Sequence, residues 1–231
     1  MGCKKDYMDT KIYLLSQQIT DDRADNYPID TTTYTYDEHD RIIGIVDGSG
    51  SHKISFGIEY DNQNRVTTAR KFDSNGALFI EFDFFYKPDT SGYYFYGPTH
   101  AADTAYFNFN DRHQVIKIMT KHSGYQTFTY DGRGNVATTQ AFAQDGSSGL
   151  FDQISFAYDT QKNPFSESSS NNLFFMYIAH RDPSTLINNV LVKDADTYTY
   201  TYNKDGFPTS ATINTGKHII PVYFNYIIKT P

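Results

Sequence analysis

A short hairpin unit recurs along most of this chain and constrains its fold more than any other feature. The clearest copy spans residues 125–142 and reads YQTFTYDGRGNVATTQAF. In this unit an aromatic residue, a spacer, a tyrosine and an aspartate precede a short turn, and a β-branched run returns from it. Phe128 and Tyr130 are expected on one face of the first strand, with Thr127 and Thr129 on the other.

The return strand of this copy is expected to alternate in the same way. Val136, Thr138 and Gln140 would share one face, and Ala137 and Thr139 the opposite one. Further copies place the same aromatic–Asp or aromatic–Asn step at Tyr36-Asp37, Tyr60-Asp61, Phe109-Asn110, Tyr158-Asp159 and Tyr202-Asn203, with a looser copy at Tyr86-Lys87.

Repeats of this kind cannot bury an apolar face alone, so neighbouring copies must pack side by side. The sequence therefore predicts an all-β fold, an antiparallel meander of repeated hairpins that forms a barrel-like or strongly curved sheet. The recurrence of the repeat on both sides of one insertion favours a single β domain over residues 11–231, preceded by a flexible tether over residues 1–10. Residues 11–20 could be a strand or a short helix, and we favour a strand.

One stretch departs from the repeat. Residues 164–193 are predicted to form an irregular insertion, within which residues 173–180 (LFFMYIAH) favour a short buried helix. Elsewhere residues 78–86 alternate as a half-buried antiparallel strand, with Ile80, Phe82, Phe84 and Tyr86 on one face.

Composition narrows the classes of function. The chain has 20 Tyr, 18 Phe and no Trp, which suits an aromatic β core. The net charge of −7 and the lack of a basic stripe exclude nucleic acid as an expected partner. The strand faces opposite the aromatic residues carry Thr, Ser, Gln, Glu and Lys, so we expect a soluble barrel with an aromatic interior, and a monomer.

The N-terminal residues, Met1-Gly2-Cys3-Lys4-Lys5-Asp6, resemble the mature end of a bacterial lipoprotein. A small residue, Gly2, precedes the single cysteine, and charged residues follow it. We therefore expect lipidation at Cys3, and we expect Met1 not to be the start of the natural precursor. The alternative is an ordinary free thiol. N-myristoylation is disfavoured, because Asp6 stands where a serine or threonine is needed.

The best candidate for ligand contact is a run of four aromatic residues: Tyr93, Tyr94, Phe95 and Tyr96. Exposed rings often mark a binding patch. The competing interpretation, that they fill the core, is the stronger one on sequence alone.

Other polar patterns favour structural roles. Asp37, Asp61, Asp131 and Asp159 are expected to form turns, because the alternating oxygen ligands of a calcium loop are missing. The seven histidines show no metal-binding spacing. No nucleophile elbow or phosphate loop is present, so we expect no catalytic residues, no metal and no cofactor. Glu59, Glu81 and Asp83 are conceivable catalytic carboxylates, but we favour them as solvent-facing strand residues.

Two families share these motifs. The Tyr-x-Tyr-Asp-x-x-x-Arg hairpin resembles the YD repeat of RHS-type proteins, although the glycine of that repeat is missing before Arg41 and Arg65. The chain more closely resembles a domain-of-unknown-function lipoprotein family with a porin-like fold from Gram-negative gut bacteria. The matching motifs are Gly2-Cys3-Lys4-Lys5-Asp6, Tyr13-Leu14-Leu15-Ser16, Tyr36-Asp37, Tyr60-Asp61, Lys162-Asn163-Pro164-Phe165 and Asn188-Asn189-Val190. The resemblance implies an antiparallel barrel attached to the envelope, and no activity.

Three functions follow as hypotheses. The favoured one is a non-catalytic lipoprotein of the Gram-negative cell envelope, placed at the outer membrane, that binds a glycan or protein and meets the membrane only through its lipid. The second is a hydrolase whose residues converge from separate strands. The third is a structural fragment of an RHS-like shell.

Overall fold

The computed structural model describes residues 11–23, 29–48, 53–87, 90–98, 100–122, 124–143, 153–168 and 187–230. These residues contain sixteen β-strands and no α-helix. The strands are β1 (Ile12–Thr20), β2 (Asp30–Tyr36), β3 (Ile42–Asp47), β4 (Ile54–Tyr60), β5 (Val66–Phe72), β6 (Leu78–Lys87), β7 (Thr90–Gly97), β8 (His100–Phe109), β9 (Val115–Thr120), β10 (Gly124–Tyr130), β11 (Val136–Phe142), β12 (Ile154–Tyr158), β13 (Val190–Lys193), β14 (Asp196–Tyr202), β15 (Pro208–Asn214) and β16 (Ile219–Lys229). None of the described segments is a helix long and apolar enough to cross a membrane.

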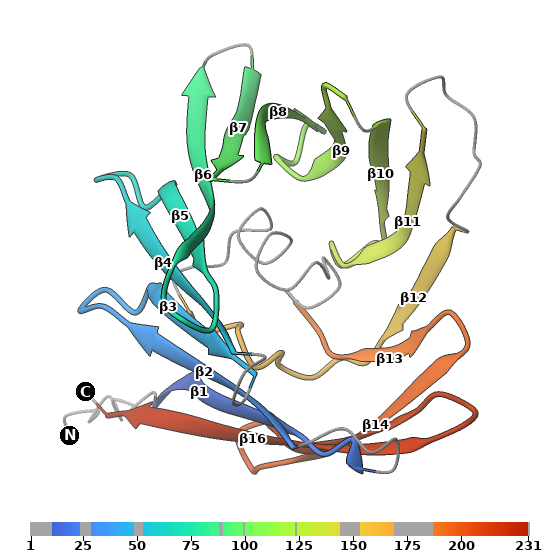
Figure 1. The fold of residues 1–231 in the computed structure, drawn as a ribbon. Helices are drawn as coiled ribbons and strands as arrows, with labels where there is room; N and C mark the ends of the chain where they lie inside the picture. The colour runs from blue at the N-terminus through green and yellow to red at the C-terminus, as the bar shows by residue number, and fades with distance from the viewer. Residues whose placement is uncertain are drawn as a thin grey trace, which may run out of the picture.

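Each strand pairs antiparallel with its neighbours in the chain, and the first strand pairs with the last (Figure 1). The β1–β16 ladder runs from Ile12 opposite Lys229 to Thr20 opposite Val222. This ladder closes the sheet into a barrel, which removes the exposed edges of an open sheet. The predicted antiparallel meander is confirmed, and so is the strand expected over residues 11–20.

The aspartate of each hairpin unit is used within its own turn. Asp37 Oδ1 accepts hydrogen bonds from the backbone N–H groups of His39 (2.9 Å) and Arg41 (3.0 Å), and Oδ2 accepts one from Arg41 Nε (2.7 Å). Desolvation of Asp37 opposes its ionisation, but these hydrogen bonds outweigh that effect and lower its pKa. The same two backbone hydrogen bonds recur in the turns that begin at Asp61, Asp73, Asn110, Asp131 and Asn203.

The fourth residue of these turns adopts a left-handed conformation, which favours glycine. Gly76, Gly134 and Gly206 hold this position in three turns, but His113 holds it in a fourth, with φ of 58°. His113→Gly is therefore expected to raise the free energy of unfolding by about 0.5–1 kcal/mol, measured by urea denaturation. Gly76→Ala is the matched control: a Cβ there meets nothing within 4 Å, so its loss of stability reports the conformation alone. A destabilised His113→Gly protein would contradict this account.

In most units the tyrosine hydroxyl joins its hairpin to the preceding one. Tyr60 donates its hydroxyl to the Ile42 carbonyl (2.7 Å), and the Arg41 guanidinium lies 4.7 Å from the centroid of the Tyr60 ring. Tyr86 repeats the arrangement with Val66 and Arg65. The hydroxyls of Tyr36, Tyr130, Tyr158 and Tyr226 also donate to carbonyls of neighbouring hairpins. This bond explains why the position is a tyrosine more often than a phenylalanine.

A β-bulge accompanies the unit and overturns part of the predicted alternation. Tyr130 pairs with Val136 whereas Thr129 pairs with Thr138, so Ala137 is an extra residue in the return strand. The extra residue reverses the alternation of the side chains that follow it. Val136 and Thr139 are therefore both buried, with 2% and 3% of their surface exposed. The expectation that Val136 and Thr138 share a face was therefore wrong.

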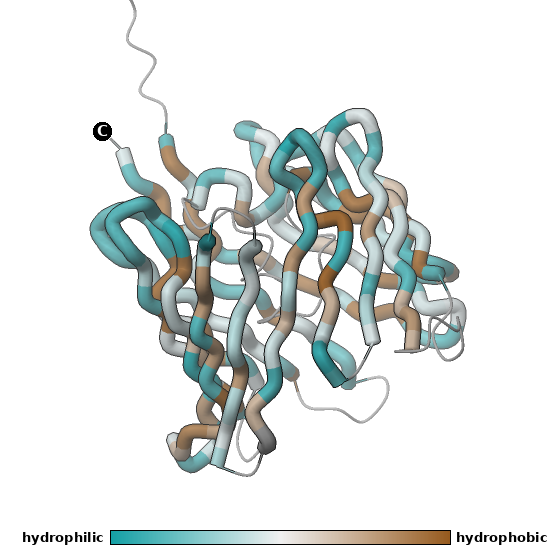
Figure 2. The backbone as a smooth tube through the Cα atoms, turned by 90° about the horizontal axis from the view of Figure 1, so that it is seen from above, coloured by the Kyte–Doolittle hydropathy of each residue, from teal (hydrophilic) through white to brown (hydrophobic). Residues whose placement is uncertain are grey.

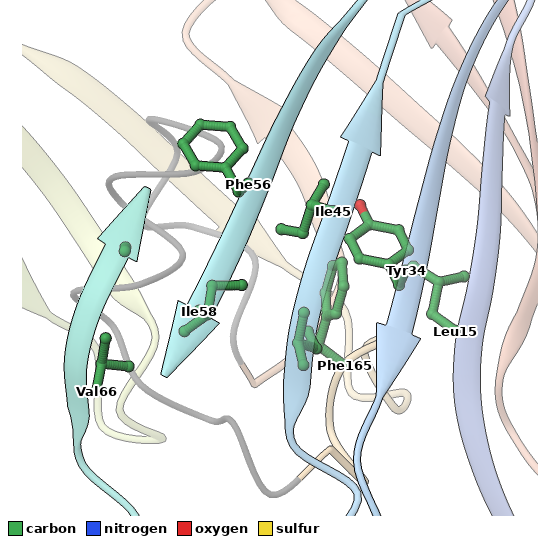
Figure 3. Packing of buried hydrophobic residues seen from close by; sticks show 9 residues of the cluster. Leu15, Tyr34, Ile45, Phe56, Ile58, Val66 and Phe165 are labelled. Atoms are coloured by element: carbon green, nitrogen blue, oxygen red, sulfur yellow. The ribbon is translucent and has the colours of Figure 1, made fainter. Parts of the chain in front are cut away.

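The inner face of the barrel carries the core. Apolar side chains from β1 to β5 form one cluster, and Phe165 from a turn at residues 163–168 packs into it, with its ring centroid 5.2 Å from that of Tyr34 (Figure 3). Figure 2 shows apolar and polar residues mixed along the strands, with polar residues at many turns. The predicted insertion ends earlier than expected, because Val190–Lys193 forms β13; the predicted helix at residues 173–180 lies outside the described residues.

Candidate functional site

An outer aromatic row crosses six neighbouring strands. In successive ladders Phe85 faces Gly92, Gly92 faces Tyr106, Tyr106 faces Met119, Met119 faces Tyr125, and Tyr125 faces Phe142. We call Phe85, Tyr94, Tyr106, Met119, Tyr125 and Phe142 the outer aromatic row. Tyr94, Tyr106 and Met119 are 45%, 37% and 40% exposed, respectively. The row therefore presents apolar surface to the outside of the barrel.

Gly92 allows the rings at one end of the row to meet. A Cβ at this position would lie 2.0 Å from the Ala105 carbonyl oxygen and 2.8 Å from Cζ of Phe85. Without it, the Phe85 ring lies over β7, 4.9 Å from the ring of Tyr94 and 6.2 Å from that of Tyr106, measured between centroids. The glycine thus continues the row across a strand that contributes no side chain at that point.

The other end of the row contains a shallow pocket of about 260 Å³. It is lined by Tyr106, Met119, Thr120, Lys121, Gly124 and Tyr125. The Tyr125 ring stacks on Phe142 with centroids 4.6 Å apart, and Lys117 Nζ lies 3.8 Å from the Tyr125 centroid. Two tyrosine rings and Lys121 therefore line one concave surface, and Lys117 lies beside it.

The four residues predicted to contact a ligand do not form one surface. They all lie in β7, whose alternation turns Tyr93 and Phe95 into the core and Tyr94 and Tyr96 outward. Tyr93 is 7% exposed, whereas Tyr94 is 45% exposed and joins the outer aromatic row. Two of the four rings therefore pack in the core and two are exposed, and ligand contact by the exposed rings stays a prediction.

Tyr96 belongs to a charged cluster on the outer face. Its hydroxyl lies 2.7 Å from Glu81 Oε1 and 3.0 Å from Asp83 Oδ2, while Arg70 binds Glu81 at 2.7 Å and Glu59 at 2.5 Å. The hydrogen bond from Tyr96, and then Arg70, lowers the pKa of Glu81 against its partial desolvation. The carboxylates Glu59, Glu81 and Asp83 therefore lie in ion pairs and hydrogen bonds on the barrel wall.

Asp159 differs from the other turn aspartates, because it anchors a polar network inside the barrel. Its Oδ1 accepts hydrogen bonds from the backbone N–H groups of Gln161 and Asn189, both at 3.0 Å, and its Oδ2 accepts from Asn189 Nδ2 (3.0 Å) and the Tyr202 hydroxyl. No group of three or more metal-ligating side chains occurs in the part of the chain that the structure describes. Cys3, His52 and His180 lie outside that part.

Beside this network lies an inner pocket of about 220 Å³. Its walls come from the inner faces of β1 and β14–β16, and residues 163–165 and 189–190 close one side. Tyr198, Tyr200, Phe165 and Phe224 supply its rings, and Asn189 and Gln18 supply amide groups. None of the described residues lining it is charged.

Neither a family model nor a curated protein matches this chain. A porin-like protein from Bacteroides uniformis aligns over 94% of this chain and 97% of that one, with a TM-score of 0.59 and 15% identity. The two proteins share a fold. A porin-like protein from Bacteroides vulgatus aligns over 93% of this chain and 99% of that one, with a TM-score of 0.43 and 11% identity. The Photorhabdus luminescens Tc holotoxin pore aligns over 87% of this chain and 10% of that one, with a TM-score of 0.22 and 13% identity.

At 15% identity the first match shows the fold alone, and the porin-like fold that the resemblance implied is confirmed. Lipidation and the relation to YD repeats stay predictions. Sequence reasoning missed most of the outer aromatic row, namely Phe85, Tyr106, Met119, Tyr125 and Phe142. Each is an outward residue of its own strand, and the row arises only from the register between strands. The sequence therefore indicated that these side chains point outward, but not that they line up across neighbouring strands.

Proposed function

We propose that this protein is a non-catalytic barrel of the Gram-negative envelope that binds a glycan chain along the outer aromatic row. The observation that carries the proposal is the continuity of the row over β6 to β11. Adjacent strands lie about 4.8 Å apart, so five intervals span roughly 24 Å. A surface of that length suits an extended chain better than a single small molecule.

The chemistry of the row favours a sugar chain over a peptide strand. A peptide that binds by strand addition needs an unpaired sheet edge, and the ladders of the described strands close on one another. The tyrosine rings carry hydroxyl groups and lie close to Lys117 and Lys121, which matches the mixed apolar and hydroxylated surface of a sugar. Exposed aromatic patches of this extent mark binding sites in many proteins.

We propose a non-catalytic protein because of the charged cluster around Arg70 and Glu81. A glycosidase needs one carboxylic acid with a raised pKa opposite a second carboxylate. Here Arg70 lies between Glu59 and Glu81, and the pKa of Glu81 is lowered. The shell-fragment alternative needs free edge strands at both ends of the chain, but β1 and β16 pair with each other. That pairing also supports a monomer.

The envelope address rests on Cys3 and on the shared porin-like fold. The anchor would be a lipid, since charged side chains such as Arg70 and Glu59 on the outer wall oppose contact with a bilayer interior. Cells that express the natural precursor should incorporate an alkynyl fatty acid, and Cys3→Ala should abolish that labelling. Equal labelling of both proteins would remove the anchor from the proposal.

A glycan and peptide array tests the binding surface. We expect the full chain to retain one or more glycans, and Tyr94→Ser with Tyr106→Ser to weaken that binding at least about tenfold, since two stacking rings are lost. Tyr223→Ser is the matched control, because Tyr223 is 48% exposed on β16, away from the row. Silence on glycans, or binding that depends equally on Tyr223, would overturn the proposed surface.

A further inference from the structure

Two lysines lie along one side of the outer aromatic row. Lys87 comes two residues after Phe85 on β6, so it points to the same outer face, and its Nζ lies 5.4 Å from the centroid of the Phe85 ring. Lys117 on β9 lies over Tyr125, with its Nζ 3.8 Å from the ring centroid. Lys87 is exposed and Lys117 is half-buried. The row therefore holds two ammonium groups against its own rings.

Neither lysine forms an ion pair with a carboxylate in the part of the chain that the structure describes. Three other cations lie over rings, namely Arg41, Arg65 and Lys162, and each of them also pairs with an acidic side chain. In those three places the charge is neutralised within the fold. The charges of Lys87 and Lys117 are instead available to a ligand.

The two lysines belong to a second line of side chains beside the row. Lys117 faces Asn108 on β8 and Thr127 on β10, and Lys87 faces Thr90 on β7. Each of these residues stands two positions, or roughly 7 Å, from the row residue or from Gly92 on its own strand. We call this line the lysine flank. It comprises Lys87, Thr90, Asn108, Lys117, Thr127 and Gln140, none of which is acidic.

The other side of the row is acidic at β6. Asp83 comes two residues before Phe85 and faces Tyr94. Arg70 pairs with the neighbouring Glu81, but Asp83 has no basic partner among the described residues. A negatively charged chain on the row is therefore attracted to the lysine flank and repelled on the side of Asp83.

We propose that the glycan held by the outer aromatic row is acidic, and that its carboxylate or sulfate groups bind Lys87 and Lys117. This inference rests on the proposed function and narrows the ligand to one class. The lysines stand three strand intervals apart, roughly 14 Å, which suits charges that repeat along a chain better than one charged group. The rings hold both ammonium groups at the surface of the row, so less side-chain freedom is lost on binding.

A single-stranded nucleic acid also combines rings with negative charge, but this surface fits it less well. Such a ligand binds through a basic groove that follows its backbone and neutralises many phosphates. Two lysines opposite the Asp83 carboxylate, on a chain with a net charge of −7, do not form such a groove. An oligonucleotide therefore belongs among the probes.

Matched pairs of polysaccharides test the charge requirement on the full chain. Polygalacturonate is compared with its fully methyl-esterified form, and dextran sulfate with dextran, so that carboxylate and sulfate are each tested on an unchanged backbone. In biolayer interferometry at about 20 mM salt, at least one acidic polymer should bind about tenfold more tightly than its neutral partner. The difference should shrink at about 0.5 M salt, because salt screens exposed charges.

The outcomes separate this inference from the proposed function. Equal binding of acidic and neutral polymers that still depends on Tyr94 and Tyr106 would overturn the acidic ligand and leave the proposed surface intact. Retention of only neutral glycans on the array would have the same consequence. Silence of all four polymers and of the glycan array would overturn both.

Substitution of the lysines locates the contact. Lys87→Gln with Lys117→Gln should weaken binding of the acidic polymer about fivefold or more and leave binding of its neutral partner unchanged. Lys204→Gln with Lys217→Gln is the matched control, because both residues are exposed in the turns on either side of β15 and the same two charges are lost. Equal weakening by the two double variants would reveal an effect of net charge and overturn the site. Oligothymidine that binds as tightly as the acidic polymer, through the same two lysines, would overturn the proposal in favour of nucleic acid.

Discussion

Gly92→Ala is expected to lower the free energy of unfolding by about 3 kcal/mol. The added Cβ would lie 2.0 Å from the Ala105 carbonyl oxygen, which belongs to the backbone of the neighbouring strand and cannot rotate away. The strands β7 and β8 would have to separate locally, with loss of ladder hydrogen bonds on both sides of the contact. Guanidinium denaturation followed by circular dichroism measures the change.

Two further variants define the cause of that loss. Gly132→Ala should be close to neutral, because a Cβ there meets nothing within 4 Å and its backbone has no positive φ. Phe85→Ala combined with Gly92→Ala should not restore stability, since the ring is the second obstacle and the backbone oxygen the first. Restored stability in the double variant would show that the Phe85 ring, and not the neighbouring strand, limits this position.

The local structure of the hairpins was predictable from sequence. Aspartate after an aromatic strand end indicated a turn, and Asp37 and Asp61 form the expected side-chain bonds to backbone N–H groups. Alternation in residues 78–86 placed Phe82 and Phe84 on one face of the strand, and both are partly buried against the core clusters. These features depend on neighbours within a few residues, so the sequence contains all of their determinants.

Closure and register depend on partners that sequence alone does not name. Nothing in residues 12–20 specifies that they pair with residues 219–229, yet that ladder decides between an open sheet and a barrel. The bulge at Ala137 likewise depends on how Tyr130 meets the return strand. A single inserted residue exchanges the faces of everything beyond it, which is why Thr139 was assigned to the wrong side.

The candidate sites show the same division. Strand alternation applied to Tyr93, Tyr94 and Phe95 would have separated the exposed ring from the buried ones. The contacts of Asn189 were beyond sequence reasoning, because its two amide hydrogens go to Asp159 Oδ2 and to the Lys162 carbonyl. Those partners lie about thirty residues away in the chain.

Phe165→Ala is expected to have the largest effect of any truncation in the turn at residues 163–168, a loss of about 3–5 kcal/mol. Phe165 is 6% exposed, stacks edge-on against Tyr34, and lies in the cluster formed by β1 to β5 (Figure 3). It supplies the apolar contact of this turn with the first strands of the barrel, beside the hydrogen bonds of Glu167 with the Tyr13 N–H and of Ser168 with the Asp40 carbonyl. Its removal leaves a cavity between elements that are far apart in sequence and cannot collapse onto each other.

The matched control is Phe79→Ala on the outer face of β6, where the ring is 39% exposed and the expected loss is about 1 kcal/mol. In chemical denaturation, the free energies of unfolding of the two variants should therefore differ by about 2 kcal/mol or more, which is the difference between these two losses. Hydrogen exchange should also show faster opening of β1 and β2 in Phe165→Ala, because the lost contact joins the turn to those strands. Equal losses in the two variants would mean that the Phe165 ring stabilises the closed barrel no more than an exposed ring does.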